Sequence, residues 1–251
     1  MFPPAHAQST LMPKSFSPTD NHLLAALPAD VQGRLFPHLK LLALPLGKVL
    51  YESGDTMHTV YFPIDSIVSL LYVMQNGSSA EISVVGNEGL IGISLFMGGE
   101  STPSRAIVQS AGHAWQLPGK LLKDEFNLHG KLLVLMLRYT QALITQMAQT
   151  AVCNRHHSID QQLCRWLLLS LDRLPTNKLT MTQELIANML GVRREGVTEA
   201  ASKLQKLGII EYSRGKITVL DRTKLERLSC ECYAVVRKET ERLLPYFSPQ
   251  T

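Results

Sequence analysis

The stretch that decides the fold is TQELIANMLGVRREGVTEAASKLQKLGIIEYSRGKITV, residues 182–219. Apolar residues recur at helical spacing in its first part, stop at Gly191-Val192, and recur again up to Leu207. Alternating residues on both sides of Ser213-Arg214-Gly215-Lys216 then predict two short strands. Two helices joined by a glycine-containing turn and followed by a β-hairpin predict a winged helix-turn-helix.

The second of these helices, expected from about Arg193 to Leu207, begins with a polar face. Val197, Ala201 and Leu204 lie three or four residues apart and are expected to point inward. A helix that enters the major groove of DNA needs a polar N-terminal face, where Arg can bond to guanine and Glu to cytosine. The alternative, a helical hairpin whose charges only face solvent, does not account for the turn, the face and the wing together. The residues predicted to contact DNA are Thr182, Gln183, Arg193, Arg194, Glu195, Thr198, Glu199, Arg214 and Lys216.

Upstream of this unit the sequence predicts two more helices. Residues 158–173 form an amphipathic helix with Ser158 as its N-cap. Residues 130–153 form a helix of roughly six turns, which is too long for one small domain to cover. We interpret its apolar stripe as a homodimer seam, and the alternative is a helix packed on its own domain. The predicted seam consists of Leu132, Met136, Tyr139, Leu143 and Met147.

The first half of the chain has a different pattern. After one or two short helices between residues 22 and 45, residues 46–117 run in short segments rich in β-branched and aromatic residues, separated by turn signals. Asn76-Gly77 marks the clearest hairpin. This pattern predicts a small β-barrel or roll. Residues 1–20, rich in proline, serine and threonine, are expected to form a disordered arm.

The predicted fold class is therefore α+β, with an N-terminal antiparallel β-roll, a long dimerisation helix and a C-terminal winged helix-turn-helix. The first 20 residues form the arm and the last 21 a helical tail. The domain boundaries that we predict are 1–20, 21–127, 128–155, 156–230 and 231–251.

The charge of the 251-residue chain is unevenly distributed. Residues 1–127 hold 7 Lys and Arg against 10 Asp and Glu, a net charge of −3, whereas residues 128–251 hold 18 against 11, a net charge of +7. A basic second half favours a polyanionic partner. No run approaches the ~18 uncharged apolar residues of a membrane span, so we expect a cytoplasmic protein without a membrane partner. No catalytic motif is present, so we expect no enzyme activity.

At this point the sequence resembles the Crp/Fnr family of bacterial transcription regulators. The resemblance covers residues from about 22 to 228 and is most specific from Thr182 to Val219. It implies a DNA-binding regulator that acts as a homodimer on a near-palindromic site, and an activator of this kind also contacts RNA polymerase. It further implies that Arg194 and Glu195 read bases. Glu199 stands where the cyclic-AMP receptor branch has an Arg, so the preferred DNA site is expected to differ.

The same resemblance places a nucleotide-binding cassette at residues 92–106. Ile93 stands where cyclic-nucleotide-binding members carry the Glu that holds the ribose hydroxyl, and a buried hydroxyl without its partner costs about 1 to 3 kcal/mol. The cassette therefore predicts a roll that is degenerate for cyclic AMP. Arg105 remains a candidate ligand for an anion, although an ion-paired surface arginine is the alternative. A sensor gated by an unidentified small molecule, haem or a redox effector is the alternative function.

The four cysteines, Cys153, Cys164, Cys230 and Cys232, all lie in the second half. Their positions do not supply the N-terminal ligands of the family's iron–sulfur sensors. His58 and His113 are the nominal haem ligands in the roll, but ordinary histidines are the expectation. Cys153 and His156 lie three residues apart, near enough to share a metal ion. Cys230 and Cys232 would point to opposite sides of a helix. We therefore predict neither a metal site nor a cofactor. The thiols are expected to be reduced, and the sequence does not decide whether any of them is redox-active.

Overall fold

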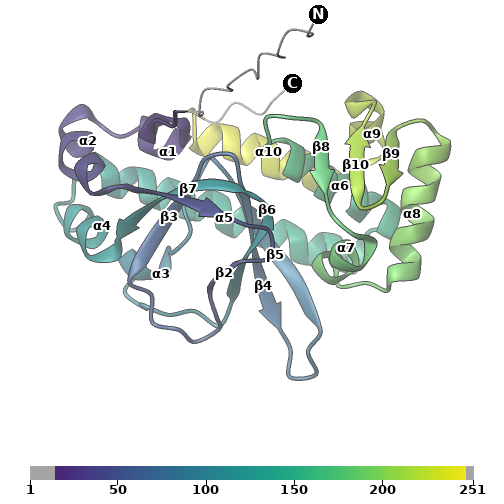
Figure 1. Cartoon of the computed structure of the whole chain (residues 1–251), viewed down its shortest axis with the longest axis horizontal. Helices are drawn as coiled ribbons and strands as arrows, with labels where there is room; N and C mark the ends of the chain where they lie inside the picture. Colours follow the sequence, from purple (N-terminus) through teal and green to yellow (C-terminus); the bar gives the residue numbers. More distant parts are fainter. Residues whose placement is uncertain (1–14, 247–251) are drawn as a thin grey trace, which may run out of the picture.

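The computed structural model describes residues 15–246, and Figure 1 shows the elements in chain order. The N-terminal half is rich in strands and the C-terminal half in helices, as the change of period in the sequence predicts. The elements of the first half are α1 (His22–Ala25), α2 (Ala29–Leu35), β1 (Lys40–Leu44), β2 (Val49–Tyr51), β3 (Thr59–Pro63), β4 (Ile67–Val73), β5 (Ser79–Val85), α3 (Ser94–Met97), β6 (Arg105–Ser110), β7 (Gly112–Pro118) and α4 (Gly119–Phe126).

The strands of the first half form two antiparallel sheets with the orders β1-β7-β3 and β2-β6-β4-β5. A core of aliphatic and aromatic side chains, including Phe62 and Leu117, is buried in this roll. The predicted hairpin is β4–β5, and Gly77 in its turn has a φ of 83°. The β-roll of the prediction is confirmed.

The prediction of a disordered arm over residues 1–20 is wrong for residues 15–20. Residues 1–14 lie outside the described part of the chain, but residues 15–20 are described and include a 3-10 turn, Pro18–Asp20. Ser17 and Asp20 cap this turn reciprocally, and the indole of Trp115 donates to the Ser17 carbonyl oxygen at 3.1 Å. Order therefore begins before His22, because the roll supplies hydrogen bonds that sequence composition does not show.

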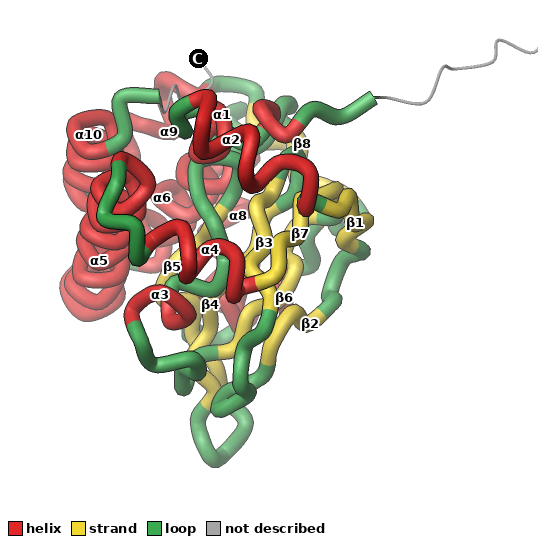
Figure 2. The backbone as a smooth tube through the Cα atoms, turned by 90° about the vertical axis from the view of Figure 1, so that its left-hand side faces the viewer, coloured by secondary structure: helices red, strands yellow, loops and turns green. Residues whose placement is uncertain are grey.

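The second half begins with α5 (Lys131–His156), which runs along the roll and leads into the C-terminal unit formed by α6 to α10 (Figures 1 and 2). Ser158 caps the next helix, as predicted. The remaining elements are α6 (Ile159–Leu171), β8 (Lys178–Thr180), α7 (Gln183–Leu190), α8 (Arg194–Lys206), β9 (Ile210–Ser213), β10 (Lys216–Val219), α9 (Arg222–Leu228) and α10 (Glu231–Leu243). The short third sheet has the order β8-β10-β9.

The stripe of α5 that we predicted as a dimer seam instead faces the chain's own roll. Leu132, Met136, Tyr139 and Leu143 are all at most 3% exposed and belong to the roll's core, and Met147 packs against the same core. The Tyr139 hydroxyl donates to the Leu90 carbonyl oxygen at 2.8 Å. The predicted seam is therefore wrong, because an apolar stripe does not tell which of two partners covers it.

Close packing in the loop after β5 explains two glycines there. A Cβ atom on Gly89 would lie 2.2 Å from the Tyr139 ring, and one on Gly86 would lie 2.7 Å from the Cβ of Arg173. Both glycines therefore let α5 and the end of α6 approach the roll closely. Among residues 15–246, no helix combines the length and the apolar character needed to cross a bilayer.

The roll and the C-terminal unit share a second buried core. Ile67, Leu71 and Val84 of the roll pack in one cluster with Trp166 and other residues of α6 to α10. Arg173 and Glu88 form an ion pair across this boundary at 2.7 Å, with side chains only 3% and 4% exposed. Removing one partner of such a pair leaves a buried charge and costs about 3 to 5 kcal/mol. The two units are therefore fastened together within one chain.

A chain of polar side chains crosses the same boundary from Glu81 through Ser69 and Gln109 to Ser170 of α6. The Ser69 hydroxyl lies 2.6 Å from a Glu81 carboxyl oxygen and 2.6 Å from the Gln109 amide oxygen, while the Gln109 amide nitrogen donates to Ser170 at 3.1 Å. The hydroxyl has one proton for two neighbouring oxygens, so a protonated Glu81 supplies the second proton. Burial accordingly raises the pKa of Glu81 to about 7.

We expect Glu81→Gln to change the pH dependence of stability. The folded chain keeps the Glu81 proton up to about pH 7, whereas the carboxyl of the unfolded chain has its ordinary pKa of 4.5. The wild type therefore loses stability as the pH rises between these values. The full loss is of the order of 3 kcal/mol, and the variant avoids it. Urea unfolding at pH 5 and pH 8 measures this: the variant should gain on the wild type at pH 8. The exposed control Glu211→Gln should show no such gain, and an equal difference at both pH values would contradict the assignment.

Candidate DNA interface, sensor pocket and thiol cluster

Local sequence rules fix the helix-turn-helix. The Thr182 side chain caps α7 by accepting a hydrogen bond from the Leu185 amide at 3.2 Å. Gly191 ends α7 with a left-handed φ of 66°, a conformation that glycine adopts without strain. Arg193 then precedes α8 without a side-chain cap, so the first turn of α8 presents its backbone N–H groups beside an exposed Arg194.

The two faces of α8 differ as predicted. Val197, Ala200, Ala201 and Leu204 are buried against the domain core. The residues on the opposite face are exposed, and those predicted to contact DNA are Arg194, Glu195, Thr198 and Glu199. The polar face of the recognition helix is therefore accessible in this structure.

An open recess of about 440 Å³ lies where α7, α8 and the wing meet. Its lining includes Thr182, Gln183, Arg194 and Arg214. The Thr198 hydroxyl donates to the Gln183 side chain at 2.7 Å and so ties α8 to α7. Two arginines beside the start of a helix make this recess suited to a phosphate or to the edge of a base.

The wing hairpin presents basic side chains at its tip. Ser213 pairs with Lys216, leaving a two-residue turn in which Arg214 has a φ of 50° and Gly215 a φ of 76°. Both residues are in the left-handed region, as a tight hairpin turn requires. Arg214 and Lys216 are exposed.

Two other predicted residues lie away from the recess. The Glu199 carboxylate is 3.1 Å from the Lys203 ammonium group, which also lies 3.1 Å from Asp160 of α6. Arg193 lines a second recess with Ala80 and neighbouring residues of the β4–β5 hairpin. The structure therefore groups Thr182, Gln183, Arg194 and Arg214 more closely than the sequence order indicates.

The roll contains a pocket of about 350 Å³ under α3. Met147 of α5, one of the five residues predicted for the dimer seam, lines this pocket. Among the described side chains that line it, none is Lys, Arg or His. The lining residues are Tyr51, Leu70, Tyr72, Ile82, Ile93, Ser94, Met97, Gly99, Ser101, Thr102, Pro103, Ser104 and Met147.

The candidate ligand residues of the roll have other partners. The Arg105 guanidinium donates to Glu52 at 2.7 Å and does not line the pocket. His113 lies 3.2 Å from Asp65, and His58 is exposed. The ion pair of Arg105 fits the surface arginine that we weighed against an anion ligand, and the contact of His113 fits the ordinary histidine that the sequence predicts.

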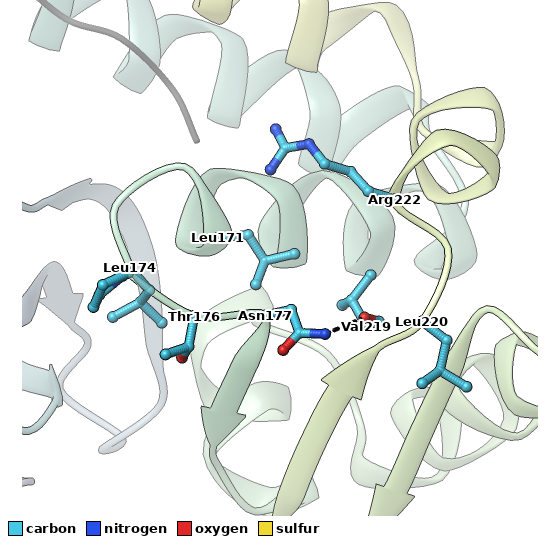
Figure 3. Close-up of a pocket in the computed structure, with 8 residues that line it drawn as sticks. Leu171, Leu174, Thr176, Asn177, Val219, Leu220 and Arg222 are labelled. Atoms are coloured by element: carbon cyan, nitrogen blue, oxygen red, sulfur yellow. Dashed lines mark hydrogen bonds between the residues drawn. The ribbon is translucent and has the colours of Figure 1, made fainter. Parts of the chain in front are cut away.

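A further recess, of about 340 Å³, lies between the end of α6 and β10 (Figure 3). Asn177 spans it by donating to the Val219 carbonyl oxygen at 2.9 Å. Arg222, at its rim, bonds to Asp172, Tyr233 and Glu226. Because these contacts hold the Arg222 guanidinium group, this side chain stabilises the packing of the domain and is not offered to a ligand in the recess.

Three cysteines and one histidine meet where α5 ends and α10 begins. The Sγ atoms of Cys153 and Cys230 are 3.5 Å apart, and the Sγ atom of Cys232 is 3.5 Å from Nδ1 of His157. The prediction that Cys230 and Cys232 point apart is wrong, because Cys230 is the N-cap of α10 and lies outside the helix. The histidine beside Cys153 is His157, not the exposed His156.

The thiols have unequal pKa values. The hydrogen bond with Cys153 lowers the pKa of Cys230 to about 5, whereas burial raises the pKa of Cys232 to about 11. Cys164 is buried apart from this cluster, and burial raises its pKa to about 12. Sequence spacing gave no signal for the cluster, since its two halves are 73 residues apart.

Comparisons with known proteins agree with both halves of the fold. The family described as cyclic nucleotide-binding domain matches residues 41–129, and the Crp-like helix-turn-helix domain matches residues 161–228. No curated relative matches the chain.

Solved structures with the same fold include two proteins described as regulators and FixK2. A putative Crp/Fnr-family transcriptional regulator from Eubacterium rectale is 20% identical, with a TM-score of 0.61 over 82% of this chain and 96% of that one. FixK2 from Bradyrhizobium japonicum is 15% identical, with a TM-score of 0.64 over 76% and 98%. The c-di-GMP-responsive regulator CLP from Xanthomonas campestris is 15% identical, with a TM-score of 0.61 over 76% and 99%. With a sensor roll and a Crp-like helix-turn-helix in this order, the chain belongs to the Crp/Fnr family of DNA-binding transcription regulators.

Proposed function

We propose that the chain binds a near-palindromic DNA site as a homodimer and that cyclic AMP is not its effector. The observation that carries this proposal is the outer face of α5. Val134, Leu137, Ile144 and Val152 on this face are 46%, 53%, 56% and 46% exposed. An apolar stripe of this length on a soluble chain favours a partner surface.

The spacing of the outer face fits a second copy of the same helix. Val134, Leu137, Gln141, Ile144 and Ala148 follow one another at intervals of three and four residues, and all are exposed. This is the heptad spacing of a helix pair, and a two-fold axis lets the same stripe serve both chains. The proposed seam therefore lies on the side of α5 opposite the stripe chosen from the sequence.

A dimer through α5 would present two α8 helices to one face of DNA. Recognition helices of such dimers enter major grooves about one turn, roughly 34 Å, apart. In this arrangement Arg194 and Glu195 contact bases, while Arg214 and Lys216 contact phosphates. RNA polymerase is the further partner that activation of transcription would require.

The lining of the roll pocket supports the exclusion of cyclic AMP. A cyclic phosphate carries a negative charge, and the described lining offers no cation to pair with it. Ile93 offers no acceptor to a ribose hydroxyl. An uncharged apolar effector fits this pocket better, and Met147 would pass its presence to α5. Gating by such a ligand is the second candidate function.

We expect Ile144→Glu to dissociate the dimer. The substitution would bury two carboxylates near the middle of the seam without cationic partners, which is costly. Sedimentation velocity at micromolar concentration should show a shift from dimer to monomer. The control Leu207→Glu changes an equally exposed leucine outside α5 and should leave the dimer intact. An unchanged mass for Ile144→Glu would refute the outer seam.

Arg194→Ala and Arg214→Ala should have different effects on DNA binding. Loss of a base contact at Arg194 should lower specific affinity by about 1 to 3 kcal/mol and relax the choice of one base pair in each half-site. Loss of a phosphate contact at Arg214 should weaken specific and random DNA alike and reduce the salt slope by about 1. Fluorescence anisotropy at several salt concentrations measures both. If Arg194→Ala lowers the affinity for specific and for random DNA by the same factor, Arg194 does not read bases.

Recovery of genomic DNA fragments by the purified protein tests the proposed function directly. At one stated salt concentration, we expect a near-palindromic motif that is the same with and without cyclic AMP. A motif that appears only with cyclic AMP would contradict the interpretation of the pocket. Absence of a motif in both samples would contradict binding without an added effector.

A further inference from the structure

The thiol cluster has the composition of a metal site. The ligand atoms of Cys153, His157, Cys230 and Cys232 all lie within 4.8 Å of one another. The three cysteines are buried, and together they form a small cluster separate from both main cores. Cys153 and His157 lie at the end of α5, and Cys230 and Cys232 lie at the start of α10. Helix α10 runs beside α5 in both views (Figures 1 and 2).

The distances fit one tetrahedral ion. With Zn–S bonds of about 2.3 Å and Zn–N bonds of about 2.0 Å, the ligand atoms of a tetrahedral site lie about 3.5 to 3.8 Å apart. The Cys153–Cys230 and Cys232–His157 pairs are both at 3.5 Å. An iron–sulfur cluster would hold its cysteine sulfurs further apart than one ion does, so the geometry favours a mononuclear site.

The groups around the cluster also fit a metal. Nδ1 of His157 faces the thiols, and its Nε2 lies 3.4 Å from the Glu231 carboxylate. A metal-bound histidine commonly gives its other ring N–H to a carboxylate in this way, which fixes the ring and makes it a better ligand.

A buried arginine provides the matching charge. Arg165 is only 3% exposed and donates to Thr150 at 3.2 Å, while its Nε atom has no hydrogen-bond partner. No carboxylate of the described residues forms an ion pair with it within 4.0 Å. The Arg165 guanidinium interacts electrostatically with the thiols of Cys153 and Cys232. Three thiolates, a neutral histidine and a divalent ion sum to a charge of −1, which this guanidinium balances.

We propose that Cys153, His157, Cys230 and Cys232 bind one Zn²⁺ ion. Four protein ligands close the coordination sphere, which makes this a structural site with no open position for chemistry. The ion fastens α10 to the last turn of α5, next to Ser158, where the DNA-binding unit begins. The site thus holds the junction through which the two functional halves of the chain are connected.

The test compares two adjacent histidines in the full chain. Protein purified under reducing, anaerobic conditions is stripped with a chelator, reloaded with Zn²⁺, desalted and analysed by mass spectrometry for metal. We expect one zinc per chain for the wild type and for His156→Ala, whose side chain is exposed. His157→Ala should lower the Zn²⁺ affinity by more than about 100-fold, since even outer-shell changes cost 10- to 100-fold.

Cobalt provides a second readout that does not depend on a variant folding. Co²⁺ added to the stripped wild type should give the thiolate charge-transfer and visible bands of a tetrahedral sulfur-rich site, and Zn²⁺ should displace them. Cys164→Ala, which changes a buried thiol outside the cluster, should keep both the bands and the zinc.

Four results would overturn the proposal. One is a wild type that holds no zinc, shows no cobalt bands and has four free thiols. Another is a Cys153–Cys230 disulfide in freshly prepared protein, and the third is an iron–sulfur absorption spectrum with several irons per chain. Equal loss of zinc in His156→Ala and His157→Ala would likewise exclude the assigned ligand set.

Discussion

The rest of the structure depends on one 26-residue helix, α5, that no single domain can cover. Its inner face completes the core of the roll through Leu132, Met136, Tyr139 and Leu143. Its outer face keeps an apolar stripe in solvent. Because a helix buries only the side that meets a partner, the inner face is covered by the chain itself and the outer face is left for the second copy that we propose.

The same helix lies between two boundaries of different character. Along the roll, the DNA-binding unit is attached by a shared apolar core, the Arg173–Glu88 ion pair and the polar chain from Glu81 to Ser170. At the far end of α5, the thiol cluster attaches α10. Reorientation of the DNA-binding unit would have to break buried polar contacts at the first boundary, and the proposed zinc ion would hold the second. The proton on Glu81 and the proposed zinc ion thus lie at the two boundaries that attach the unit carrying α8 to the rest of the chain.

Much of the fold follows from local patterns in the sequence. The hairpin at Asn76-Gly77, the caps at Ser158 and Thr182 and the turn at Gly191 all stand where the sequence predicts them. The inward and outward faces of α8 are also correct. These features depend on interactions within a few residues of chain, or on a periodicity that one element carries by itself. The resemblance to Crp/Fnr regulators rests on the same local features, and the comparisons confirm it.

Contacts between distant segments were beyond the sequence. The sequence could not tell which of the two apolar stripes of α5 packs against the roll, because both have helical spacing. Only the folded roll shows which stripe it covers. Nor could the sequence join Cys153 and His157 to Cys230 and Cys232, because the whole DNA-binding unit separates the two pairs along the chain and only the packing of α10 on α5 brings them together. By itself the sequence determined the type and order of the elements, through turn chemistry and periodicity. Only the tertiary structure decided which face meets which partner, since burial and ligand geometry arise where segments far apart in the chain come together.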